Sequence, residues 1–150
     1  AGCVTAGRAG RKLAHLDELW AAGVRVFTDD GDCLADAGLL RRAMEYLSDH
    51  GGVIAQHAED AGLAGAGQMH EGEISALLGL AGIPAAAEEV VVARDLAIAR
   101  LTGGWYHVQH VSTAGTVALI RAAKQEGLRV TAEVTPHHLA FDNAAARAAV

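Results

Sequence analysis

The fold follows from the stretch EEVVVARDLAIARL (residues 88–101), which a glycine pair separates from YHVQH (106–110). The first segment predicts a helix that ends at Gly103 and Gly104, and the second predicts a short strand. A helix of this length directly before a strand is typical of a βαβ unit. The stretch therefore predicts a parallel sheet covered by helices.

The same alternation of short apolar runs and helical patterns extends outward in both directions. The predicted strands cover residues 24–28 (VRVFT), 53–57 (VIAQH), 106–110 and 129–134 (RVTAEV). The predicted helices cover residues 10–22, 37–47, 73–80, 88–101 and 113–125. Strands separated by helices of about 10–15 residues form right-handed βαβ units, so we expect an α/β fold with a parallel sheet.

The composition limits the class of protein. With 150 residues the chain can bury one core, and its 51% hydrophobic and 20% charged residues exclude a disordered chain. A net charge of −6 lacks the basic excess of a nucleic-acid or membrane-surface protein, so we expect neither partner. Cys3 and Cys33 are too few for a disulfide scaffold and fit a reducing cytoplasm, which is the location we expect.

Three of the predicted strands end in side chains that can bind a metal. Asp29 and Asp30 follow the strand at 24–28, and the next two strands end in His57 and His110. Parallel sheets collect their ligands at the carboxyl edge, so we expect these side chains to meet there. Two imidazoles and one carboxylate favour zinc. The alternative for each histidine taken singly is a structural residue held by hydrogen bonds.

Strand alternation selects between the two acids and between two histidines. Asp30 shares the face of Thr28, whereas Asp29 points to the opposite face. His107 lies on the face opposite to His110 by the same rule, and we expect it to pack under a helix. Asp30, His57 and His110 are therefore the candidate metal ligands.

Other polar residues have structural or open interpretations. Arg94 and Asp95 are expected either to form a structural ion pair or to be exposed charges. Cys33 follows the acidic turn but is not expected to be a ligand in such oxygen-rich surroundings. His137 and His138 follow the last strand, and His137 either supports the metal site from outside its ligands or makes a structural hydrogen bond.

Five motifs together resemble a known family. They are VFTDDG (26–31), VIAQHAED (53–60), HEGEISALLGLAGIPAAAEEVVVARD (70–95), HVQHVSTAGTVALIRAAKQEG (107–127) and VTAEVTPHHL (130–139). Across residues 1–142 the chain resembles the class I bacterial dihydroorotases of the amidohydrolase superfamily, which are relatives of allantoinases and hydantoinases. The resemblance implies part of a (β/α)8 TIM-type barrel, approximately strands 4–7, so that residues 1–150 are an interior segment of one barrel domain, incomplete at both ends.

The resemblance also implies a metal site and an activity. Asp30 corresponds to the carboxylate that bridges two Zn2+ ions, and His57 and His110 correspond to ligands of one of them. The implied reaction is the zinc-dependent, reversible cyclisation of N-carbamoyl-L-aspartate to L-dihydroorotate in de novo pyrimidine (UMP) biosynthesis. The family's His-x-His pair and catalytic aspartate have no counterpart in residues 1–150, so we expect no catalytic residue here and assign none that binds substrate.

Three alternatives stay open. One is a non-catalytic dihydroorotase-like subunit that serves as a scaffold for aspartate transcarbamoylase; this association and a homodimer are the protein partners that the resemblance raises. Another is an allantoinase or hydantoinase, although many such relatives bridge their metals with a carboxylated lysine, and this chain has none between Lys12 and Lys124. The third is a doubly wound domain of flavodoxin type, which would require a phosphate-binding loop that the sequence lacks.

We predict that the 150-residue chain by itself does not hydrolyse dihydroorotate, because the family's proton-transferring aspartate and half of its metal ligands are missing from it. A spectrophotometric assay of the purified chain with added zinc tests this expectation. Measurable turnover by this polypeptide alone would contradict it.

Overall fold

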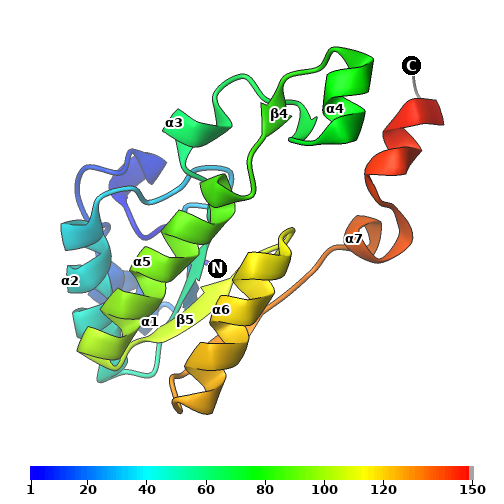
Figure 1. Ribbon diagram of the computed structural model, residues 1–150. Coiled ribbons are helices and arrows are strands. Elements are labelled where there is room, and N and C mark those ends of the chain that lie inside the picture. Colours follow the sequence, from blue (N-terminus) through cyan, green and yellow to red (C-terminus); the bar gives the residue numbers. More distant parts are fainter. Residues whose placement is uncertain (149–150) are drawn as a thin grey trace.

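Four parallel strands form the main sheet of the computed structural model, which describes residues 1–148 (Figure 1). The strands are β1 (Val26–Phe27), β2 (Val53–Gln56), β5 (Trp105–Val108) and β6 (Val130–Ala132). Each strand pairs with the next main-sheet strand along the chain, in the order β1-β2-β5-β6. The predicted strands are therefore all present, in the predicted parallel arrangement, although each is shorter than its apolar run.

Helices connect the strands and cover one face of the sheet. They are α1 (Leu16–Ala21), α2 (Ala37–Ser48), α5 (Ala86–Thr102) and α6 (Ala114–Gln125). Because the strand order never reverses, right-handed crossovers place every connecting helix on the same side. A doubly wound domain reverses its order and covers both faces, so the flavodoxin-type alternative is wrong. A one-sided layer with consecutive strands is the arrangement of a segment of a (β/α)8 barrel.

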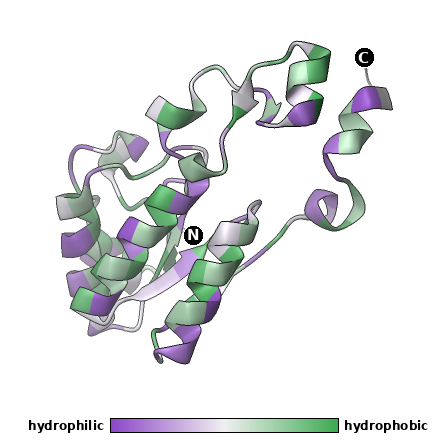
Figure 2. Cartoon of the chain, in the orientation of Figure 1, coloured by the Kyte–Doolittle hydropathy of each residue, from purple (hydrophilic) through white to green (hydrophobic). Residues whose placement is uncertain are grey.

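The register aligns one apolar row across all four strands. Phe27 pairs with Ile54, Ile54 with Tyr106, and Tyr106 with Val130, and none of these side chains is more than 5% exposed. The row packs against apolar residues of the helices, and Figure 2 shows hydrophilic residues on the outer side of α2. On the other face, Val26 and Trp105 remain 38% and 37% exposed. The core therefore lies between the sheet and its helices.

The N-terminal residues differ from the prediction of a helix over 10–22. Gly2 exchanges backbone hydrogen bonds with β1 in parallel fashion, and Thr5 forms an antiparallel bridge with Leu13. Gly10 adopts a left-handed conformation (φ +64°) that turns the chain back toward this bridge. The helix α1 therefore begins only at Leu16, because the preceding residues satisfy their backbone groups through the bridge.

An excursion between β2 and α5 holds short elements. They are α3 (Ala61–Ala64), β3 (Met69–His70), α4 (Glu73–Leu78) and β4 (Gly82–Ile83). The two short strands pair in parallel, and a side chain at Gly82 would collide with the backbone of Glu71. After β6, α7 (Pro136–Ala140) and a 3-10 turn (Asn143–Ala148) run away from the sheet toward α4 (Figure 1).

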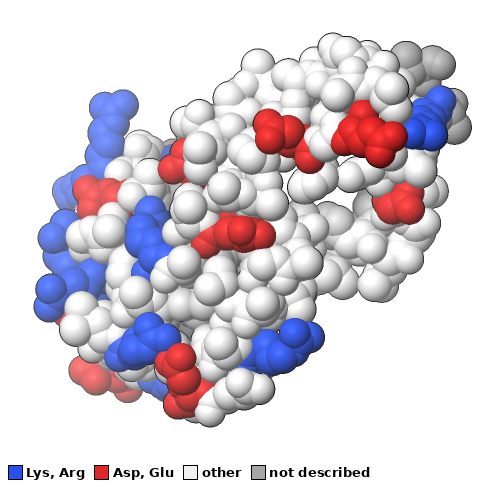
Figure 3. All heavy atoms as spheres, viewed as in Figure 1, with Lys and Arg blue, Asp and Glu red and all other residues white. Residues whose placement is uncertain are grey.

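The outer surface carries charges of both signs. Figure 3 shows acidic and basic side chains interspersed over the face that α5 and α6 present. Arg100 and Glu126 form one such pair at 2.6 Å, joining the C-terminal end of α5 to the residue that follows α6. Among the described residues, no helix combines the length and the apolar character that crossing a bilayer requires.

A buried polar network ties α5 to the sheet. The Asp95 carboxylate is fully buried and accepts hydrogen bonds from Gln56 Nε2 (3.0 Å), Tyr106 Oη (3.0 Å) and Arg94 Nε (2.7 Å). Arg94 also donates to the Leu34 carbonyl at 2.8 Å. Of the two interpretations open for Arg94 and Asp95, the structural ion pair is the one observed. Burial raises the pKa of Asp95, and burial with the adjacent carboxylate raises that of Tyr106.

We expect Asp95→Ala to lower the free energy of unfolding of the full-length protein by about 3–5 kcal/mol, because Arg94 would keep a half-buried charge without its partner. Urea denaturation followed by circular dichroism measures the change. Glu45→Ala is the control, since its exposed pair with Arg41 contributes about 0.3–0.5 kcal/mol. Equal losses in the two variants would contradict the role of the network.

Candidate metal centre

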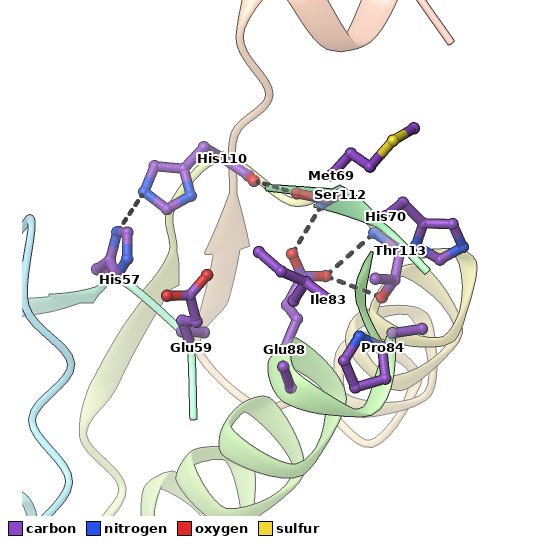
Figure 4. Close-up of a pocket in the computed structure, with 13 residues that line it drawn as sticks. His57, Glu59, Met69, His70, Ile83, Pro84, Glu88, His110, Ser112 and Thr113 are labelled. Atoms are coloured by element: carbon purple, nitrogen blue, oxygen red, sulfur yellow. Dashed lines mark hydrogen bonds between the residues drawn. The ribbon is translucent and has the colours of Figure 1, made fainter. Parts of the chain in front are cut away.

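Asp30, His57 and His110 meet at the carboxyl edge of the sheet. Asp30 Oδ1 lies 3.5 Å from His57 Nδ1 and 3.5 Å from His110 Nε2, and the two imidazole nitrogens are 3.0 Å apart. The two rings stand nearly perpendicular, at 74°, and Figure 4 shows a nitrogen of each ring facing the other. The structure thus brings together all three residues that the sequence singles out, and their atoms form a group able to hold a metal ion.

The spacing of these donor atoms suits a tetrahedral zinc ion. Ligand atoms about 2.1 Å from zinc at tetrahedral angles are separated by about 3.4 Å. The observed separations of 3.0 to 3.5 Å bracket that value. The side chains are also partly open, with 26% of His57, 32% of His110 and 49% of Asp30 exposed. Water and a small molecule can therefore reach the group, as a catalytic metal site requires.

The acids of the turn after β1 have separate partners. Asp29 is buried and accepts hydrogen bonds from the Val4 amide (2.9 Å), the Thr5 amide (3.1 Å) and the Thr5 hydroxyl. Asp32 pairs with Arg8 at 2.6 Å on the surface. Asp29 therefore binds the N-terminal segment, and the Asp30 carboxylate is the one that faces the two histidines.

Strand alternation accounts for Asp30 but not for His110. Tyr106 and Val108 point into the helix layer, so regular alternation would send His110 there as well. His110 instead has a φ of +35°, and its ring lies beside His57. Regular alternation, which places His110 on the face opposite to His107 and therefore with Val108, is wrong as an account of where the His110 ring points.

The prediction that His107 packs under a helix is also wrong. Its side chain lies on the uncovered face of the sheet, in a cavity that it shares with Thr28 and Glu133. His107 Nδ1 is 2.8 Å from Thr131 Oγ1, and Nε2 is 3.4 Å from a carboxylate oxygen of Glu133. The helix-facing positions of this strand belong to Tyr106 and Val108, whose side chains are fully buried.

Two uncharged side chains support the position of Asp30. The Thr28 hydroxyl donates to Gln109 Oε1 at 2.8 Å and accepts a hydrogen bond from the Asp30 amide at 3.0 Å. This contact joins β1 to the end of β5, although β2 lies between them in the sheet. It therefore sets the spacing between the strand ends that carry Asp30 and His110.

A cavity of about 230 Å³ adjoins the two histidines (Figure 4). Its polar side includes Glu59 and Glu88, and the Glu59 carboxylate turns into the cavity between His57 and Glu88. Its other side comes from the excursion and includes His70. A small polar ligand would fit between the candidate metal ligands and the excursion residues that line the cavity.

The remaining candidates lie outside the ligand group. His138 Nδ1 accepts a hydrogen bond from the Thr135 amide at 3.2 Å, at the start of α7. His137 is an exposed residue of the same helix and is not among the clustered ligands. Burial raises the pKa of the Cys33 thiol, which keeps it protonated and makes it a poor metal ligand.

Comparison with known proteins identifies the family. A family model described as dihydro-orotase-like matches residues 2–116, and the chain belongs to this family. It is 51% identical over 144 residues to a dihydroorotase of Pelotomaculum thermopropionicum, covering 96% of this chain and 34% of that protein. It is 54% identical over 140 residues to a dihydroorotase of Streptomyces coelicolor, covering 92% of this chain and 33% of that protein. The chain thus spans about a third of the length of the curated relatives it matches.

A solved structure confirms the fold. The chain superposes on the D-hydantoinase from Bacillus sp. AR9 with a TM-score of 0.68 and 25% identity, covering 86% of this chain and 30% of that one. Its α/β layer is therefore part of an amidohydrolase TIM barrel, as the family resemblance implied.

We predict that Thr28→Val lowers the free energy of unfolding by about 0.5–1.5 kcal/mol, because the Asp30 amide and Gln109 lose their shared, partly buried partner. Thr116→Val is the matched control: the Thr116 hydroxyl is fully buried with no partner among the described residues, so its removal stabilises by about 1 kcal/mol. Urea denaturation of both full-length variants measures the difference. The same sign of change in both would contradict the role assigned to Thr28.

Proposed function

We propose that this chain is an interior segment of the barrel domain of a dihydroorotase and carries part of its metal site. The observation that carries the proposal is the convergence of Asp30, His57 and His110 at the carboxyl edge of the sheet. Identities of 51% and 54% to curated dihydroorotases support the substrate. The whole protein would cyclise N-carbamoyl-L-aspartate reversibly to L-dihydroorotate in pyrimidine biosynthesis, in the cytoplasm.

Zinc is the proposed metal, with two ions in the intact site. His57 would bind through Nδ1 and His110 through Nε2, each as a neutral imidazole, and Asp30 has the two oxygens needed to bridge two ions. A zinc pair, when bound, polarises a substrate carbonyl and makes water acidic enough to ionise near neutral pH.

The chain's own residues prepare the site. Thr28 fixes the Asp30 backbone, so the residue loses less backbone freedom when its carboxylate meets the histidines. Asp29, whose oxygens are already occupied by Val4 and Thr5, does not compete for the metal. The cavity wall beside His57 and His110 would hold the substrate against the metal-binding edge and limit access of bulk water.

A hydantoinase is the second candidate, favoured by the structural likeness to the Bacillus D-hydantoinase. Asp30 at the bridging position and the higher identity to dihydroorotases make it the weaker one. Parallel assays of the full-length protein with dihydroorotate and with a 5-substituted hydantoin separate the two candidates. A scaffold subunit for aspartate transcarbamoylase would show neither activity.

We expect Asp30→Ala in the full-length protein to abolish dihydroorotate hydrolysis and to remove bound zinc, because one carboxylate serves both ions. Elemental analysis after gel filtration measures the metal content. Asp32→Ala is the matched control from the same turn, and it should keep both metal and activity since its carboxylate pairs with Arg8. Zinc retained at the level of the unaltered protein in Asp30→Ala would refute the bridging role.

A further inference from the structure

His110 is held in a backbone conformation that a residue with a side chain rarely adopts. Its φ of +35° lies in the left-handed region, where a Cβ atom crowds the following carbonyl. Such strain persists only when surrounding contacts over-determine the conformation. Without it, strand alternation would carry the ring into the helix layer beside Val108 and away from His57.

Val111, directly after His110, donates its amide to the Glu133 carbonyl at 2.9 Å. The next two residues, Ser112 and Thr113, are held by one carboxylate from another helix. Glu88, in the first turn of α5, accepts hydrogen bonds from the Ser112 amide at 2.8 Å through Oε2. Its Oε1 accepts from the Thr113 amide at 3.1 Å and from the Thr113 hydroxyl at 2.8 Å. Figure 4 shows these contacts converging on Glu88 from the segment that leads out of His110.

Both ends of the bend are therefore fixed. On the strand side, the Gln109 amide donates to the Gln56 carbonyl at 3.2 Å. On the far side, Thr113 caps α6 by accepting from the Thr116 amide, while Glu88 holds Thr113 itself. The bend at His110 lies between these anchors and has little freedom to relax.

The chemistry of the contacts requires a carboxylate. Three donors from Ser112 and Thr113 converge on two oxygens, and a carboxylate is the side-chain group that accepts at both ends without donating. A glutamine at residue 88 would face one of these donors with its own NH2 group. An alanine would leave all three donors without this partner.

We propose that Glu88 is a positioning residue that holds His110 in its metal-binding conformation. The proposal rests on the proposed role of His110 as a metal ligand. Glu88 is not one of the clustered donor residues: it acts through Ser112 and Thr113, and its effect is to keep His110 Nε2 beside His57 Nδ1 and Asp30 Oδ1.

The test compares the full-length protein with Glu88→Ala, Glu88→Gln and the control Glu89→Ala. Glu89 follows in the same helical turn, and its carboxylate lies over Gly115 of α6. Zinc affinity is measured by competition with a chelator, and the visible spectrum of the cobalt(II)-substituted proteins reports the ligand geometry. Loss of a direct hydrogen-bond partner of a metal ligand weakens binding about 10–100-fold; Glu88 acts one step further out, through Ser112 and Thr113, so the loss expected for it is about 10-fold, the lower end of that range. We expect that loss in Glu88→Ala, a smaller loss in Glu88→Gln, and an unchanged affinity and spectrum in Glu89→Ala.

Two further measurements make the outcome decisive. If Glu88 only packs α5 against α6, the metal-free Glu88→Gln protein melts at a lower temperature while its folded form binds zinc normally, and this result overturns the proposal. Equal zinc loss in the Glu88→Ala and Glu89→Ala proteins overturns it as well. His110→Ala is assayed in parallel: if it keeps normal zinc affinity, the proposed metal centre fails and the role of Glu88 fails with it. Zinc loss in His110→Ala without loss in Glu88→Ala overturns the positioning role alone.

Discussion

The register of the four parallel strands is the constraint on which the rest of the molecule depends. Phe27, Ile54, Tyr106 and Val130 form one buried row, so the strands that carry them stand level and end at the same edge. A shift of one residue in any strand would turn its core face outward. The apolar row therefore places the residues that follow β1, β2 and β5 within reach of one another, although they are far apart in the sequence.

Hydrogen bonds between polar side chains then fix the strand ends, which the apolar row only brings close together. Asp95 joins Gln56 and Tyr106 below the sheet, while Thr28 joins Gln109 on the other face. The bonds to Asp95 are buried, so breaking one leaves a group unpaired rather than solvated, whereas the bond between Thr28 and Gln109 is only partly buried. The sheet edge that carries the candidate metal ligands is thus supported from both faces. The uncovered face, with Val26 and Trp105 exposed, has the character of a barrel interior rather than of an outer surface.

Local patterns predicted the helices and strands and all three candidate ligands, and strand alternation correctly oriented Asp30 and His57 but not His110. Apolar periodicity gave the helix at 88–101 within two residues at its start, and alternation chose Asp30 over Asp29. The helix predicted over 10–22 failed because Leu13 pairs with Thr5, a contact that periodicity does not encode. Glu88 and Gln109 were missed because their partners are supplied by other elements of the fold.

The sequence by itself determined the order of strands and helices, the family, and the three side chains at the strand ends. Those properties follow from local spacing and from motifs that are read along the chain. Only the tertiary structure decided where His110 points. A positive φ held from outside by Glu88 and Thr113 overrides the alternation of the strand, because contacts between distant segments can stabilise a backbone conformation that the local sequence disfavours.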